Sequence, residues 1–105
     1  MGKVTMIGTF TCKDGKAEET DAVLAEMVEA ARSEPGVEIY SYHRGEGNTY
    51  WFFALMADSD SMAKHGQTDA MRAAMESFGP LVSGPPQVSV TTPISALGLD
   101  LLTSR

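Results

Sequence analysis

The chain has 105 residues, of which 43% are hydrophobic and 21% charged, so it fits one globular domain and not a disordered chain. Its 14 acidic residues outnumber its 8 basic residues and give a net charge of −6, which argues against nucleic acid and anionic membrane surfaces as partners. A single cysteine and the lack of any apolar run of signal-peptide or membrane-span type lead us to expect a cytoplasmic location.

The first half of the chain predicts a strand, a helix and a second strand. Larger and apolar residues alternate with threonines over residues 3–12, which is the period-two pattern of a strand. Residues 17–33 instead repeat apolar residues at helical spacing, and Pro35-Gly36 ends that pattern. Residues 37–44 alternate again and predict the second strand.

The second half predicts two more strands with helical segments between them. A glycine-rich loop leads into an aromatic strand over residues 49–57. Residues 58–61 offer several N-cap side chains for a short helix, and residues 71–78 have apolar residues at helical spacing. A last strand is predicted over residues 87–92. The order βαββαβ predicts an α+β ferredoxin-like fold, in which a four-stranded antiparallel sheet carries its helices on one face.

The two faces of this sheet are predicted to differ. Alternation extended through each strand places Val4, Met6, Phe10, Val37, Ile39, Phe52, Ala54, Met56, Val88 and Val90 toward the helices. The opposite face collects Ile7, Tyr40, Tyr42, Trp51, Phe53 and Leu55. Because a solvent-facing sheet rarely carries so many aromatic side chains, we expect this face to pack against a second copy and form a homodimer. The alternative is that the C-terminal tail folds back over this face.

Short motifs in a fixed order resemble the antibiotic biosynthesis monooxygenase family. They are Lys13-Asp14-Gly15-Lys16, Glu34-Pro35-Gly36-Val37, Tyr50-Trp51-Phe52-Phe53, Met62-Ala63-Lys64-His65 and Gly84-Pro85-Pro86. The resemblance implies a domain over residues 1–97, followed by a C-terminal tail over residues 98–105. It also implies a dimeric α/β barrel.

The same resemblance implies an activity and a set of departures from it. Most members oxidise aromatic, quinol-like or polyketide substrates with O₂ and without a metal, flavin or haem cofactor, while related branches degrade haem or isomerise carbonyl compounds. Where many members carry Glu and Trp on the third strand, this chain has Ala54 and Met56. Where the polyketide-oxidising branch carries Asn, Trp and Tyr, it has Phe52, Met56 and Met62. Residues 71–78 also lack the histidine of the haem-degrading branch.

His65 is the candidate catalytic residue. It occupies a position that is commonly histidine in the family it resembles, and its spacing from Met62 lets both side chains share one helix face. An imidazole can take a proton from a phenol or enol near neutral pH. The alternative is that His65 caps or bridges a helix end.

The candidate substrate-binding residues are His43, Tyr50, Phe52, Met56, Met62 and Phe78. We expect them to surround a cavity beside His65, although the apolar members could instead form ordinary core. Alternation places His43 on the helix side of the second strand, where it could meet His65 or bond to backbone or water. No metal site is expected, because two histidines do not make one and the nearby carboxylates suit helix capping.

Three functions remain open at this point. The first is a cofactor-independent monooxygenase with His65 as general base. The second is a non-catalytic ligand-binding or accessory homodimer, which the absence of the family's Asn, Glu and Trp at positions 52, 54 and 56 favours. The third is an isomerase or cyclase that transfers protons only.

Overall fold

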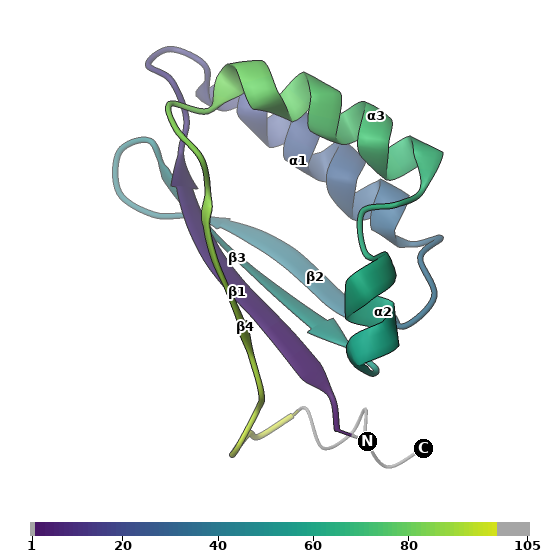
Figure 1. Ribbon diagram of the computed structural model, residues 1–105. Coiled ribbons are helices and arrows are strands. Elements are labelled where there is room, and N and C mark those ends of the chain that lie inside the picture. The colour runs from purple at the N-terminus through teal and green to yellow at the C-terminus, as the bar shows by residue number, and fades with distance from the viewer. Residues whose placement is uncertain (1, 99–105) are drawn as a thin grey trace.

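A computed structural model describes residues 2–98 of the chain (Figure 1). Its elements are β1 (Val4–Thr11), α1 (Ala17–Ala31), β2 (Val37–Arg44), β3 (Thr49–Met56), α2 (Ser59–Lys64), α3 (Asp69–Phe78), a 3₁₀ turn (Gly79–Leu81) and β4 (Gln87–Thr91). These elements confirm the predicted order, and their ends lie within a few residues of the expected bounds.

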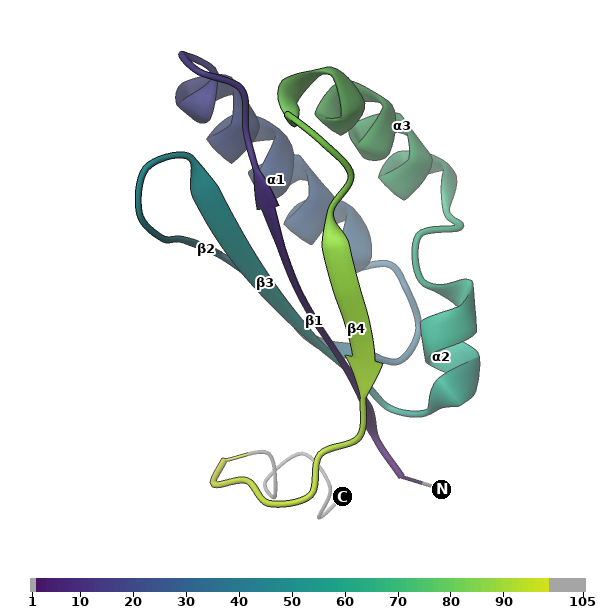
Figure 2. The same cartoon turned by 60° about the vertical axis from the view of Figure 1, so that its left-hand side comes forward.

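The four strands form one antiparallel sheet in the order β2-β3-β1-β4. Helices α1 and α3 lie side by side over one face of this sheet, which we call the inner face, and α2 lies near one end (Figures 1 and 2). No helix of the described residues covers the other face, which we call the open face. The predicted α+β ferredoxin-like fold is therefore confirmed.

An aromatic cluster fills the core between the inner face and the helices. The Phe10 ring stacks on the Tyr50 ring at a centroid distance of 5.1 Å and meets the Phe78 ring edge-on at 4.9 Å. Phe52 lies 6.4 Å from the Phe10 ring on the same face. Offset-stacked and edge-on contacts are the favourable geometries for aromatic pairs. Through them α3 packs against β1 and β3, the two central strands of the sheet.

One additional residue in β2 reverses the faces of that strand. Val37 pairs with Met56, but Ile39 already pairs with Leu55, so the register shifts between them. A bulge of this kind places every following side chain on the face opposite to the one that plain alternation predicts.

The prediction for the faces of β2 was therefore wrong beyond Val37. Tyr40 and Tyr42 pair with Ala54 and Phe52 and pack against the core, so they do not belong to the open face. His43 pairs with Trp51 on the open face, so it does not face the helices.

The open face keeps part of its predicted apolar character. The side chains of Ile7 and Trp51 are 46% and 51% exposed, and Phe53 lies between them on the same face. Leu55 also lies on this face but is completely buried within the single chain. In the described part of the C-terminal segment, Ile94 and Leu97 are almost fully exposed and do not cover the face. Of the predicted tail over residues 98–105, residues 99–105 lie outside the described part of the chain.

Both shorter helices start at side-chain caps. The Asp58 carboxylate accepts a hydrogen bond from the Ser61 backbone N–H at 2.8 Å, and the Thr68 hydroxyl accepts one from Met71 at 3.2 Å. These caps satisfy amides that have no partner inside the helix. None of the helices in the part of the chain described is long and apolar enough to cross a membrane.

Gly8 lets β1 pass close to two neighbours, which generates a stability prediction. A Cβ atom at this position would lie 2.8 Å from the Gln87 carbonyl oxygen and would overlap the Phe52 ring. We expect Gly8→Ala to lower the free energy of unfolding by about 1–3 kcal/mol, measured by urea denaturation. Gly79→Ala is the control, because its Cβ would have open space and should change stability by less than about 0.5 kcal/mol. Equal stability of the two variants would contradict the close approach.

Candidate active site

An apolar cavity of about 220 Å³ lies between the inner face of the sheet and the helices. We call it the inner cavity. It is lined by Met6, Phe10, Met27, Tyr40, Tyr42, Phe52, His65, Gly66, Met71, Met75, Phe78, Pro86 and Val88. His65, Tyr40 and Tyr42 provide its side-chain nitrogen and oxygen atoms, and the lining contains no carboxylate, lysine or arginine. A cavity of this composition suits an uncharged, largely aromatic ligand.

A buried carboxylate fixes His65 in the cavity wall. His65 is the residue that follows α2, and its Nδ1 lies 2.7 Å from Oε1 of Glu34, whose side chain is 3% exposed. The other carboxylate oxygen of Glu34 accepts the backbone N–H of Gly66 at 3.0 Å. Because a carboxylate only accepts, this geometry assigns a proton to Nδ1, and in the neutral imidazole Nε2 then carries the lone pair.

Two tyrosine hydroxyls lie beside this histidine. The Tyr40 ring meets the His65 ring edge-on at a centroid distance of 5.2 Å. The hydroxyl oxygens of Tyr40 and Tyr42 are 2.5 Å apart, and Tyr42 Oη also lies 4.0 Å from Sδ of Met27. Burial raises the pKa of both phenols, so they stay protonated through neutral pH.

Three of the predicted site residues line the inner cavity. They are His65, Phe52 and Phe78. Met56 is completely buried in the sheet and does not reach the cavity, and Met62 lies on α2 outside the lining. Met62 and His65 do not share a helix face, since α2 ends at Lys64 and His65 has an extended backbone.

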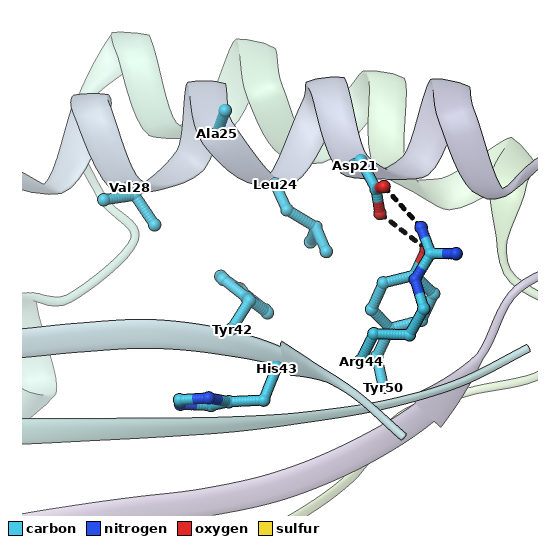
Figure 3. A pocket seen from close by; sticks show the side chains of 8 residues that line it. All are labelled: Asp21, Leu24, Ala25, Val28, Tyr42, His43, Arg44 and Tyr50. Carbon is cyan, nitrogen blue, oxygen red and sulfur yellow. Dashed lines mark hydrogen bonds and ion pairs between the residues drawn. The ribbon is translucent and has the colours of Figure 1, made fainter. Parts of the chain in front are cut away.

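Tyr50 belongs to a second hollow, an open groove of about 300 Å³ between α1 and β2 (Figure 3). Its hydroxyl donates to Oδ1 of Asp21 at 2.7 Å, and the Arg44 guanidinium pairs with the other carboxylate oxygen of Asp21. The Arg44 guanidinium also lies 5.4 Å from the centre of the Tyr50 ring. The hydrogen bonds from Tyr50 and Arg44 lower the pKa of the Asp21 carboxyl. Burial, followed by the hydrogen bond to Asp21, raises the pKa of Tyr50 to about 12.

His43 does not meet His65. Its imidazole points away from α1, on the opposite side of β2 from Tyr42 (Figure 3). Its Nε2 lies 2.9 Å from the Ser41 hydroxyl on the open face. Within residues 2–98, no three histidine, cysteine or acidic side chains lie close enough together to hold a metal ion.

Sequence reasoning missed three polar residues of this site. Glu34 was noted only as part of the Glu34-Pro35-Gly36-Val37 motif, although an acidic residue directly before a turn and a strand is a usable signal. Tyr40 and Tyr42 were assigned to the wrong face because the register shift depends on pairing with β3, which alternation within β2 does not reveal.

The chain has relatives in a known protein family. A family model described as antibiotic biosynthesis monooxygenase matches residues 3–77. An uncharacterized protein of Synechocystis sp. is 27% identical over 89 residues, which cover 83% of this chain. The chain spans 60% of the length of that curated relative.

Solved structures show the same fold. A Caulobacter crescentus CB15 protein, provisionally named an antibiotic biosynthesis monooxygenase, is 26% identical and has a TM-score of 0.83, covering 90% of this chain and 92% of its own. A variant of SnoaB, a cofactor-independent oxygenase from Streptomyces nogalater, is 19% identical with a TM-score of 0.81, covering 93% and 99%. A Mycobacterium tuberculosis structure is 20% identical with a TM-score of 0.80, covering 90% and 98%.

The three tyrosines give a spectroscopic prediction. Because all three have a raised pKa, we expect the native protein to show little phenolate absorbance at pH ~10.5, where a denatured chain is mostly ionised. The raised pKa values contribute stability that is complete below pH ~10 and is lost as the pH rises through the folded-state pKa values. An ultraviolet pH titration of native and urea-unfolded protein measures this difference. A native tyrosine that titrates with a midpoint near pH 10 would contradict it.

Proposed function

The chain belongs to the antibiotic biosynthesis monooxygenase family, and we propose that it is a cofactor-independent monooxygenase acting on a small aromatic, quinol or polyketide-like substrate. The observation that carries the proposal is the His65–Glu34 pair in the wall of the inner cavity. The pair supplies a base, and the apolar lining supplies a site for an aromatic ring.

The volume of the inner cavity suits this ligand class. An engineered apolar cavity of roughly 150 Å³ accommodates benzene, so about 220 Å³ leaves room for a substituted ring or a compact two-ring compound. Phe52 and Phe78 offer aromatic surfaces to such a ring, and the methionine side chains of the lining adapt to irregular shapes.

His65 would act as the general base in the proposed reaction. Its Nε2 would accept the hydroxyl proton of a bound quinol, and the Glu34 carboxylate would stabilise the resulting imidazolium. The quinol anion then transfers electrons to O₂, one oxygen atom becomes bonded to a ring carbon, and the other leaves as water. One quinol and one O₂ thus give one hydroxyquinone and one water, which balances both atoms and electrons.

A proton-transfer enzyme, such as an isomerase or cyclase, is the second candidate. The two positions at which many members of the family carry Glu and Trp hold Ala54 and Met56 here, and both side chains are completely buried. The same His65–Glu34 pair would suffice to take a proton beside a carbonyl group and return it at another atom. The non-catalytic alternative, a ligand-binding or accessory homodimer, needs only the cavity.

Replacement of His65 tests the catalytic proposal. With a naphthohydroquinone as substrate, we expect the wild-type protein to consume O₂ above the spontaneous rate, and His65→Asn to lose on the order of 10²–10⁴-fold of that enhancement. His43→Asn is the matched control, because this second histidine lies on the open face and should leave the rate within about twofold.

The outcomes separate the three readings. O₂ uptake by the wild type that is lost only in His65→Asn supports the monooxygenase. No O₂ uptake, together with His65-dependent exchange of α-protons in a cyclic ketone, replaces it with the proton-transfer enzyme. Ligand binding that is equal in all variants, without either reaction, leaves the binding protein.

We also propose that the open face forms a homodimer. Ile7, Trp51 and Phe53 would be shielded from water if the same faces of two copies packed together about a two-fold axis. This arrangement would be the dimeric α/β barrel that the family resemblance implies. The cytoplasmic location is likewise a proposal, consistent with the free, buried thiol of Cys12.

A charge on the open face should disrupt this dimer. We expect Trp51→Glu to shift the protein from dimer to monomer in sedimentation velocity at micromolar concentration, because two carboxylates would be buried without partners. Gln67→Glu adds the same charge at an exposed position beside α2 and should leave the dimer intact. A wild-type protein that sediments as a monomer would rule out the proposal.

A further inference from the structure

The Tyr40–Tyr42 hydroxyl pair contains a hydrogen-bond donor that the folded chain barely uses. The two phenols bring two O–H groups, and the contact between their oxygens at 2.5 Å occupies one of them. The other hydrogen, on Tyr42, reaches only Sδ of Met27, at 4.0 Å. Because either oxygen of the pair can be the donor, Tyr42 can instead donate to Tyr40, which leaves the Tyr40 hydrogen as the spare donor. A thioether is a weak acceptor, so an oxygen atom in the inner cavity would compete with it easily.

This spare donor lies next to the base. Tyr40 contacts both Tyr42 and the His65 ring, with centroid distances of 5.2 Å to each. All three side chains line the inner cavity, whose other lining side chains are apolar. Tyr40 is therefore a hydroxyl-bearing residue of the cavity lining that directly contacts the His65 ring.

We propose that Tyr40 donates a hydrogen bond to the ligand oxygen from which His65 removes a proton, and that Tyr42 supports it by donating to Tyr40. This inference rests on the proposed function, since it assigns the group that stabilises the negative charge formed there. Tyr40 is then a catalytic residue, and Tyr42 is a positioning residue that acts through it.

The surroundings of the pair favour this role. Burial raises the pKa of both tyrosines, so their hydrogens remain available while the ligand ionises. On the side of the inner cavity, the titratable groups near the pair are His65 in the wall and Glu34 behind it. On its other side, Tyr42 shares the open groove with Asp21, His43, Arg44 and Tyr50. In an apolar site, a hydrogen-bond donor held in place before an oxyanion develops stabilises it more than the same donor does in solution. Tyr42 strengthens that donor, because hydrogen bonds in a chain polarise one another.

Binding of a nitrophenol tests the proposal without any turnover. The visible absorbance of the nitrophenolate reports the ionised form, so affinities for the anion and the neutral phenol can be measured separately. We expect Tyr40→Phe to weaken anion binding by about tenfold to a hundredfold and binding of the neutral phenol by less than about threefold. Tyr42→Phe should show a smaller loss, since the Tyr40 donor remains.

Tyr50→Phe is the matched control. Tyr50 is the third tyrosine of the chain, and its hydroxyl is bonded to Asp21 in the open groove between α1 and β2, so its loss should leave nitrophenolate affinity unchanged. The assignment is overturned if Tyr40→Phe binds the anion as tightly as the wild type, or if Tyr42→Phe shows the larger loss.

Two further measurements keep the proposal separate from the proposed function. In a His65→Asn background, Tyr40→Phe should still lower anion affinity, which isolates the phenol from the imidazolium. This loss of anion affinity is expected even if the protein consumes no O₂. If Tyr40→Phe leaves the anion affinity unchanged, the role of Tyr40 is overturned while the monooxygenase proposal is not. With the wild-type protein only, nitrophenolate should bind at least tenfold more tightly than nitrobenzene, which lacks the oxygen. Equal affinities would overturn the proposal without recourse to any variant.

Discussion

The register shift in β2 determines which side chains of that strand line the inner cavity. If β2 paired with β3 without the additional residue between Val37 and Ile39, Tyr40 and Tyr42 would lie on the open face, and Ser41 and His43 would face the helices. The inner cavity would then lose its two phenols. The bulge lies at the start of β2, which is an edge strand, so it disturbs few neighbouring backbone hydrogen bonds.

Glu34 connects this strand to the histidine across the fold. It lies in the connection between α1 and β2, and its carboxylate binds both His65 and the Gly66 backbone at the junction of α2 and α3. Leaving a carboxylate buried without partners would be costly, so these two bonds fasten the junction to the segment that leads into β2. Tyr40 then meets His65 because both residues are anchored at this one place. The base and the phenols therefore come from segments distant in sequence that a single buried side chain brings together.

The sequence alone predicted what depends on local periodicity. Strand β3 and helix α3 were located because alternation and helical spacing are properties of a few consecutive residues. For the same reason residues 58–61 were recognised as N-cap candidates, and Asp58 is the one that caps α2. The face of Tyr40 and the position of His43 depend on pairing between strands, which a local pattern does not contain. His65 was found through its place in a motif, whereas its contact with Glu34, 31 residues away in the chain, exists only in three dimensions.

In the inner cavity, different side chains accept the proton and stabilise the resulting charge. Proton removal needs an acceptor held in one tautomer and a donor for the charge that follows, and the wall of the cavity offers His65 and the tyrosine pair for these tasks. Oxygenation and isomerisation share this first step, because both start from a ligand anion. The two reactions differ in the next step. An anion that is electron-rich enough to reduce O₂, such as a quinol anion, is oxygenated, whereas any other anion takes up a proton at another atom. The choice between them then lies in the ligand that enters, and the apolar lining, shaped by Phe52, Phe78 and the methionines, governs which ligand that is.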